Sequence, residues 1–192
     1  MGIVLAGGSS RRMGTDKAAV LVGGRAMSDW VVGAMKRHLS EVVAVGREGR
    51  LSGIDAIPDE WRDRRGPLAG LATVLRRFAR PVVLVAVDQP LLRPETVARL
   101  AAVGDPAAAL VPYDQVPQVT CARYPVEWAA EAGRALESGR SLTDLVRATP
   151  HLRVDAKEWS GWGEDGRSWF SFDDEASILD AERRFRIDLQ NL

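Results

Sequence analysis

The sequence has few of the residues that build disulfides and zinc sites. Its 192 residues include a single cysteine, Cys121, and two histidines, His38 and His151, which lie far apart in the chain. A lone cysteine excludes an intramolecular disulfide framework and a cysteine-rich zinc site, and the two histidines do not have metal-ligand spacing. Neither a disulfide-stapled scaffold nor a cysteine-rich zinc protein fits this composition.

Net charge and long apolar runs are also lacking. Lysine and arginine together number 26, as do aspartate and glutamate, so the formal net charge is zero. A net-basic nucleic-acid binder is therefore disfavoured. No stretch approaches the ~20 apolar residues that a membrane span needs, and the apolar segment 2–6 is too short for the core of a signal peptide. We expect a cytoplasmic protein that binds neither nucleic acid nor a membrane.

Apolar runs alternate with helical patterns along the chain. The composition, 46% hydrophobic and 27% charged, is typical of one soluble domain, here residues 1–192. Expected strands lie at 2–6, 42–45, 55–58, 82–87, 107–113, 119–124, 152–154 and 169–172. Expected helices lie at 26–38, 68–79, 95–103, 126–137, 141–147 and 174–185. This alternation predicts a layered α/β domain with a mostly parallel sheet, in which strand 119–124 could be antiparallel and segment 157–167 is a surface loop.

The segment after the first expected strand combines glycines, hydroxyls and cations. Residues 7–17 read GGSSRRMGTDK. Glycines let backbone N–H groups approach phosphate oxygens, and arginine and lysine neutralise their charge. The segment is neither a Walker A loop nor a G-x-G-x-x-G loop, and a flexible basic surface loop would have the same composition. Its place at the carboxyl end of a strand favours phosphate binding, because ligands of open α/β sheets bind there.

Carboxylates follow two of the later expected strands. Asp88 comes directly after strand 82–87, where it could hold Mg²⁺ beside a nucleotide or simply form a turn before Pro90. Asp173 and Asp174 stand at the start of the last helix, where acidic residues also serve as caps. Asp174 is expected to be the cap, whereas Asp173 could face either way.

A glycine-rich turn precedes the second expected helix. Residues 66–70 read GPLAG, and Asp59 lies shortly before them. A glycine-rich turn that leads into a helix N-terminus can bind an anion or another ligand. A plain helix start after Pro67 is the equally weighted alternative.

Several separated motifs resemble those of one family. Residues 5–17 match L-A-G-G-x-S-x-R-M-G-x-D-K, the signature of the molybdenum cofactor guanylyltransferases (MobA-type) and their nucleotidyltransferase relatives. Residues 66–70 match G-P-L-A-G, and residues 88–90 match D-x-P. The resemblance runs from Leu5 to about Phe185. It implies a Rossmann-like three-layer α/β fold of the nucleotidyltransferase type. It also implies that GMP is transferred from GTP to the phosphate of molybdopterin, with release of pyrophosphate.

The resemblance also implies roles for individual residues. Arg12 and Lys17 would hold the triphosphate and would carry catalysis together with Asp88. Asp88, joined by Asp173, would bind Mg²⁺. The implied nucleotide-binding residues are Leu5, Ala6, Gly7, Gly8, Ser10, Arg12, Lys17, Asp59, Gly66, Pro67, Leu68 and Gly70. The expected ligands are GTP, Mg²⁺ and molybdopterin; transient protein partners in cofactor delivery and the oligomeric state stay open.

The late motif departs from the family pattern, and other readings stay open. The family has N-[VI]-N-T-P or D-[VI]-D-T-P before the last helix, whereas residues 171–175 read SFDDE. Asp173 falls on the second Asn/Asp of that motif, so we expect it to bind metal more weakly than Asp88.

Cytidylyltransferase relatives carry L-A-A-G where this sequence has L-A-G-G, so Gly7 favours guanine. A different phosphorylated acceptor and a non-catalytic nucleotide-binding module are the alternatives, although a mere binder would not need Asp88.

Overall fold

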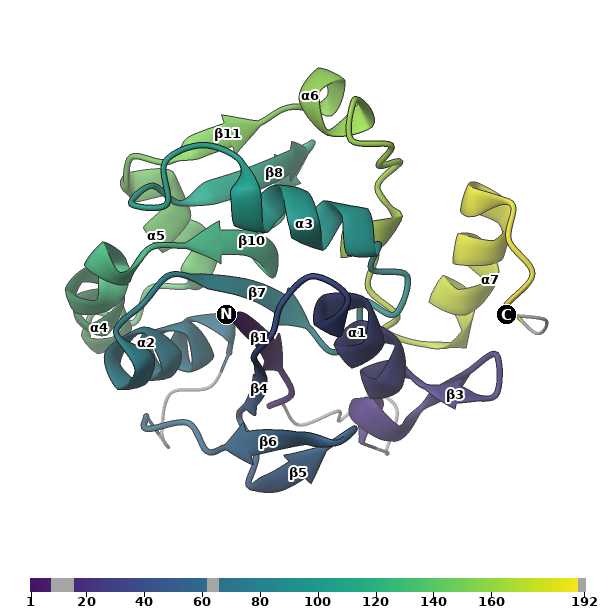
Figure 1. The fold of residues 1–192 in the computed structure, drawn as a ribbon, viewed down its shortest axis with the longest axis horizontal. Helices are drawn as coiled ribbons and strands as arrows, with labels where there is room; N and C mark the ends of the chain where they lie inside the picture. Colours follow the sequence, from purple (N-terminus) through teal and green to yellow (C-terminus); the bar gives the residue numbers. More distant parts are fainter. Residues whose placement is uncertain (8–15, 62–65, 190–192) are drawn as a thin grey trace.

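The structure is built around one mixed sheet. This computed structural model describes residues 1–7, 16–61 and 66–189. The strands lie in the order β11-β8-β10-β7-β1-β4-β6-β5, with β9 paired to β8 off this path (Figure 1). Their bounds are β1 (Gly2–Leu5), β4 (Val42–Val45), β5 (Gly49–Leu51), β6 (Ile54–Ile57), β7 (Val82–Ala86), β8 (Leu110–Asp114), β9 (Val116–Pro117), β10 (Cys121–Tyr124) and β11 (Leu152–Val154).

Neighbouring strands are mostly parallel. β1 pairs in parallel with β4 and with β7, β4 pairs in parallel with β6, and β11 pairs in parallel with β8. β10 runs antiparallel to both β7 and β8, and β5 runs antiparallel to β6. The mostly parallel α/β sheet predicted from the sequence is confirmed, as is the reversed direction of the strand near residue 120.

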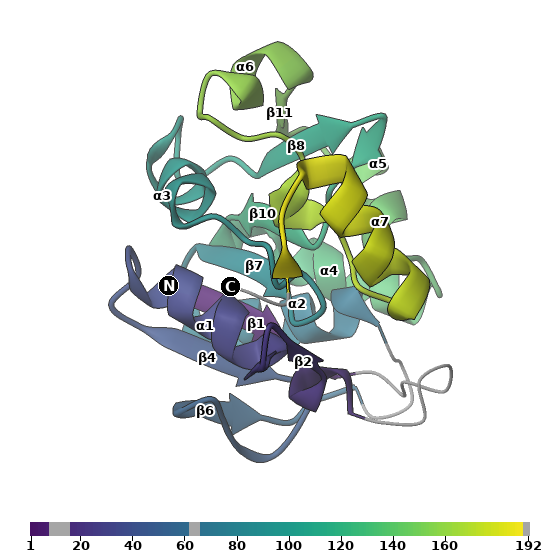
Figure 2. The ribbon, with the colours of Figure 1, turned by 90° about the vertical axis from the view of Figure 1, so that its right-hand side faces the viewer.

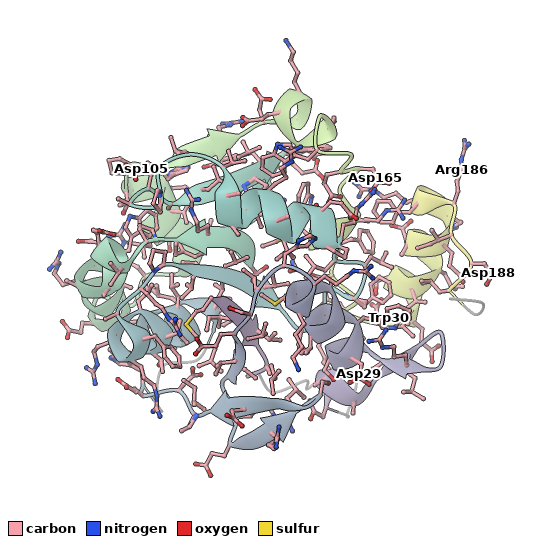
Figure 3. All side chains as sticks on the ribbon, viewed as in Figure 1. Asp29, Trp30, Asp105, Asp165, Arg186 and Asp188 are labelled. Atoms are coloured by element: carbon pink, nitrogen blue, oxygen red, sulfur yellow. The ribbon has the colours of Figure 1, made fainter. Side chains whose placement is uncertain are left out.

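Helices cover both faces of the sheet and make a three-layer arrangement. Alternate strand residues such as Ile3 and Leu5 join the core beneath α2, α4 and α5, whereas Val4 joins the core beneath α1, α3 and α6. Side chains fill the space between the layers (Figure 3). Within the residues that the structure describes, no helix has the length and apolar character needed to span a membrane. The helices are α1 (Met27–Lys36), α2 (Pro67–Phe78), α3 (Pro94–Ala102), α4 (Ala129–Glu137), α5 (Leu142–Ala148), α6 (Ala156–Ser160) and α7 (Glu175–Phe185).

A smaller core joins the last helix to the first third of the chain. Phe172 and Phe185 pack with Val22 and Met27. Val22 belongs to a short hairpin of β2 (Leu21–Val22) and β3 (Arg25–Ala26) that the sequence did not predict. Figure 2 shows α7 on the side of the molecule that faces the viewer. This packing holds the segment before α7 against the end of the sheet.

Two expectations for the late part of the chain were wrong. Residues 169–172 are not a strand: a short 3₁₀ helix (Arg167–Trp169) leads into an irregular segment, and Trp169 at the end of the helix and Phe172 in the segment are buried. Segment 157–167 is not all loop, because α6 begins after Asp155, whose side chain accepts hydrogen bonds from the first-turn amides and caps the helix. Burial of aromatic side chains under α6 and α7, rather than strand pairing, organises this region.

Two loops at the carboxyl edge of the sheet touch through their backbones. β1 and β4 are parallel neighbours, and Gly7 follows the first as Gly46 follows the second. Gly46 has φ +97°, and a Cβ at this position would lie 2.5 Å from the Gly7 Cα and 2.6 Å from the Gly7 nitrogen. Only a residue without a side chain fits here. The contact sets the course of the chain as it leaves β1.

This contact predicts a difference between two glycine substitutions. Gly49 has φ +89°, but no atom of the described residues lies within 4 Å of an added Cβ, so Gly49→Ala reports the strain of positive φ alone, about 1–2 kcal/mol. Gly46→Ala adds a backbone clash, and overpacking typically costs about 1–3 kcal/mol more. Urea unfolding should therefore show Gly46→Ala as clearly the less stable variant. Equal losses in the two variants would mean that the contact imposes no constraint.

Candidate functional site

A cleft lies at the carboxyl edge of the sheet. Its volume is about 800 Å³, within the range of pockets that bind small molecules. The ends of β1, β4, β6 and β7, the start of α2 and the segments before β10 and α7 all contribute to its wall. The lining residues are Leu5, Ala6, Gly7, Asp16, Lys17, Val45, Gly46, Arg47, Glu48, Pro58, Asp59, Trp61, Gly66, Pro67, Gly70, Ala86, Val87, Asp88, Thr120 and Ser171.

The cleft brings together most of the residues singled out from the sequence. Those that line it are Leu5, Ala6, Gly7, Lys17, Asp59, Gly66, Pro67, Gly70 and Asp88. Leu68 instead packs into the core beneath α2 and is only 3% exposed. Gly8, Ser10 and Arg12 lie outside the described residues. The binding role of each of these residues stays a prediction.

One cation joins two carboxylates at the end of the cleft. The Lys17 Nζ donates to Asp88 Oδ2 at 3.0 Å and to Asp173 Oδ1 at 2.6 Å. Burial lowers the pKa of Lys17, but the hydrogen bonds to Asp173 and Asp88 outweigh it, so the pKa is raised above its ordinary value. Lys17 is therefore charged over the whole physiological range.

The two carboxylates are also the best candidates for a metal site. Within the described ranges, no three or more histidine, cysteine, aspartate or glutamate side chains gather where they could hold a metal ion. Mg²⁺ commonly uses one or two carboxylates together with phosphate oxygens. Asp88 and Asp173, already placed to share one cation, fit that donor set when a phosphorylated ligand supplies the remaining oxygens.

A buried glutamine connects the segments beneath the two carboxylates. Gln89 Nε2 donates to Thr120 Oγ1 at 3.1 Å and to the Trp169 carbonyl at 3.4 Å. The Phe172 amide donates to the Asp88 carbonyl at 2.8 Å. These bonds hold the end of β7, the start of β10 and the segment that carries the second carboxylate together. Gln89 was not predicted from the sequence, because it occupies the unspecified middle position of the D-x-P motif.

The helix cap next to the second carboxylate was predicted correctly. The Asp174 side chain accepts a hydrogen bond from the Ser177 amide, and the Ser177 hydroxyl accepts one from the Asp174 amide. Asp174 thus caps α7, which leaves Asp173 free to reach Lys17. The departure from the family's Thr-Pro ending therefore alters how α7 begins but still places a carboxylate in the site.

The opposite end of the cleft holds a carboxylate with an unused hydrogen-bond acceptor. Asp59 follows β6, and its Oδ1 atom is buried without a hydrogen-bond partner among the residues that the structure describes. Burial raises the pKa of Asp59 above its ordinary value. Gly70 of α2 lies alongside, where a Cβ would come within 2.5 Å of the Leu5 side chain. A ligand with N–H donors would satisfy this acceptor.

Sequence reasoning also missed two large side chains in the cleft wall. Arg47, two residues beyond β4, pairs with Asp16 at 2.8 Å. Trp61 lies under the guanidinium of Arg76, 5.2 Å from its ring centre. Arg47 could have been found by the rule that identified Asp88, because both residues follow the carboxyl end of a parallel strand. Trp61 carried no recognisable signal.

Sequence comparison finds MobA-like proteins among the relatives of this chain. Residues 2–154 match the family model described as the MobA-like NTP transferase domain. A molybdenum cofactor guanylyltransferase from Rhizobium leguminosarum bv. trifolii (strain WSM2304) is 39% identical over 106 residues, which are 53% of this chain and 50% of the relative. A probable molybdenum cofactor guanylyltransferase from Mycobacterium avium (strain 104) is 34% identical over 165 residues, 80% of this chain and 83% of the relative. The chain thus matches about half the length of the first relative and most of the second.

A solved structure shares the fold over nearly the whole chain. It is the molybdopterin-guanine dinucleotide biosynthesis protein A from Archaeoglobus fulgidus, with a TM-score of 0.79 and 24% sequence identity. The match covers 97% of this chain and 99% of that chain. At this level of identity the likeness establishes the three-layer fold.

The unpartnered carboxylate predicts a pH-dependent stability effect. Because the folded protein holds Asp59 with a raised pKa, its charged form destabilises the fold as pH rises through that pKa, and the cost is absent below the unfolded pKa. Asp59→Asn should therefore raise the melting temperature at pH 7 by about 1–2 °C, since half-exposed groups keep part of their hydration. Thermal melts should show this gain shrinking toward pH 4. A gain that did not depend on pH would contradict the assignment to a buried charge.

Proposed function

The chain belongs to the MobA-like NTP transferase family, and from this premise we propose that it is a molybdenum cofactor guanylyltransferase. It transfers GMP from GTP to the phosphate of molybdopterin and releases pyrophosphate. The names of the matched relatives and the guanylyltransferase signature over residues 5–17 support this assignment. The observation that carries it is the sharing of one lysine by two carboxylates at the edge where four parallel strands end.

The triphosphate lies at the Lys17 end of the cleft. Lys17 is a compact point charge on a flexible stem, which suits a phosphate oxygen. It directly follows the glycine-rich segment 7–16, in which Arg12 supplies a second cation. The start of α2, at Gly66 and Pro67, borders the same cleft. We therefore assign Arg12 and Lys17 to the triphosphate.

The base lies at the Asp59 end. Guanine presents adjacent donors at N1 and at its N2 amino group, and a carboxylate can accept from both. Asp59 Oδ1 is a buried acceptor without a partner in the described part of the chain, and a ligand donor would remove the cost of leaving it unsatisfied. Leu5, Ala6 and Gly7 line the neighbouring wall, and the small residues leave room for a planar ring.

The residues present fit a divalent cation beside the triphosphate. Asp88 and Asp173 would hold Mg²⁺, with phosphate oxygens as further ligands. When bound, the ion neutralises negative charge on the transferred phosphoryl group and the leaving pyrophosphate. Asp88 is the less exposed of the two carboxylates, 21% against 59%, so we assign it the larger share of metal binding.

The reaction needs no protein nucleophile. A phosphate oxygen of the acceptor attacks the α-phosphorus in line, a new P–O bond forms, and the bond to the pyrophosphate oxygen breaks. The attacking phosphate is already ionised near neutral pH, so no general base is required. The protein contributes by holding the two reactants in line and by neutralising charge with Lys17 and Arg12.

Three further expectations stay predictions: the cytoplasmic location, the single-domain boundary at residues 1–192 and transient delivery partners.

Nucleotide preference is the first test of this proposal. In the presence of Mg²⁺, GTP should raise the melting temperature more than ATP, CTP or UTP at equal concentration. A ligand present at a hundred times its Kd stabilises by about 2.7 kcal/mol, which corresponds to roughly 5–10 °C in a chain of this size. A larger shift with CTP would replace the guanylyl assignment by a cytidylyl one.

Turnover should depend on the two carboxylates unequally. With GTP, Mg²⁺ and molybdopterin, Asp88→Asn should lower the rate of pyrophosphate release by about 10²- to 10³-fold, the usual loss for a preorganised electrostatic contact. Asp173→Asn should instead raise the Mg²⁺ concentration needed for half-maximal rate. Asp55→Asn, at an exposed position of β6, is the matched control. Rates are expressed per folded molecule, and an Asp88→Asn rate within a few-fold of the unaltered protein would remove this residue from the metal site.

A further inference from the structure

The Lys17 ammonium lies on the same two carboxylates that fit a divalent cation. Its Nζ is 3.0 Å from Asp88 Oδ2 and 2.6 Å from Asp173 Oδ1. The ammonium occupies one oxygen of each carboxylate, so a metal ion bound by both carboxylates would lie beside it. Two cations held this close repel each other. The observed arrangement therefore disfavours a metal bound by both carboxylates.

The backbone that carries the two carboxylates is anchored, whereas the lysine side chain is long and flexible. Asp88 lies two residues beyond the end of β7, and its carbonyl accepts from the Phe172 amide, which anchors the neighbouring segment. The Asp173 amide donates to Ser177 Oγ at 3.0 Å. Lys17, in contrast, reaches the carboxylates through a flexible four-carbon stem. Its ammonium can leave them by side-chain rotation alone, with no change in the fold.

The base of that stem is held in place. Asp16 accepts a hydrogen bond from the Ala18 amide at 3.1 Å and so caps the short 3₁₀ helix that starts at Lys17. Its other oxygen pairs with Arg47 at 2.8 Å. The Asp16–Arg47 pair is internally neutral, and the cluster of Lys17, Asp88 and Asp173 by itself carries a net charge of −1. That charge is a weak attraction for a strongly hydrated dication.

We propose that Lys17 competes with the divalent metal for Asp88 and Asp173, and that a nucleoside triphosphate resolves the competition. The triphosphate draws the ammonium onto its own oxygens and supplies the missing metal ligands, so metal and nucleotide bind with positive coupling. Metal alone binds poorly because it must displace Lys17 without compensation. This inference rests on the nucleotidyltransferase function proposed above and extends it to the order in which the ligands bind.

The test measures metal binding without nucleotide. Mn²⁺ is titrated into the 192-residue protein in the absence of GTP and acceptor, and free Mn²⁺ is followed by electron paramagnetic resonance. Lys17→Met removes the competing charge at similar length, Lys17→Arg keeps it, and Lys36→Met removes an equivalent charge from an exposed position of α1. Lys17→Met should bind Mn²⁺ about tenfold more tightly than both the unaltered protein and Lys36→Met, a typical size for coupling between ligands. Lys17→Arg should stay close to the unaltered protein.

A double variant tests whether the gain in Mn²⁺ affinity depends on Asp88. Lys17→Met combined with Asp88→Asn should lose the gain in Mn²⁺ affinity, while thermal melts verify that each variant is folded. The proposal is overturned if Lys17→Met binds Mn²⁺ no more tightly than Lys36→Met, if Lys17→Arg gains as much as Lys17→Met, or if the gain persists without Asp88. Because the titration contains neither GTP nor molybdopterin, it is independent of the nucleotide panel, whose failure would instead remove the proposed function.

Discussion

The ion cluster of Lys17, Asp88 and Asp173 links three parts of the molecule that lie far apart in sequence. Lys17 is separated from Asp88 by 71 residues and from Asp173 by 156. The parallel pairing of β1 with β7 brings the first two to one edge, and the packing of α7 against the β2–β3 hairpin brings the third. Partly exposed ion pairs of this kind contribute only about 0–1 kcal/mol each to stability. The ion pairs therefore add little to the stability of the fold, which is consistent with our proposal that the cluster serves ligand binding.

The central fold could be predicted because its signals are local. The run 82–87 is apolar on both faces, and the central strand β7 (Val82–Ala86) forms within it. Asp174 has the residue type of a helix cap, and it caps α7. The two-residue strands of the hairpin carry too little periodicity to be detected. Residues 169–172 resemble a strand, but their aromatic side chains are buried by tertiary packing with the neighbouring helices, which no local pattern reveals.

The candidate site was predictable where glycine, charge and strand ends coincide. Lys17, Asp59 and Asp88 were found in this way, and all three line the cleft. Gln89 was missed because its importance comes from a contact with Thr120, which is distant in sequence. Arg47, in contrast, follows the end of a parallel strand and could have been found by the same rule as Asp88. Asp59 illustrates that a residue of the candidate site can lower the stability of the fold. Leaving its buried Oδ1 atom without a hydrogen bond from the described residues costs stability, and a ligand donor would remove that cost.

The most direct test of the account follows the α-phosphorus of GTP. GTP labelled with radioactive phosphorus at the α position is incubated with the protein, Mg²⁺ and molybdopterin, and the products are separated; a parallel reaction carries the label at the γ position. The account predicts that the α label appears in the molybdopterin product and the γ label in pyrophosphate. Recovery of the α label in free GDP or GMP, with no labelled acceptor, would contradict it.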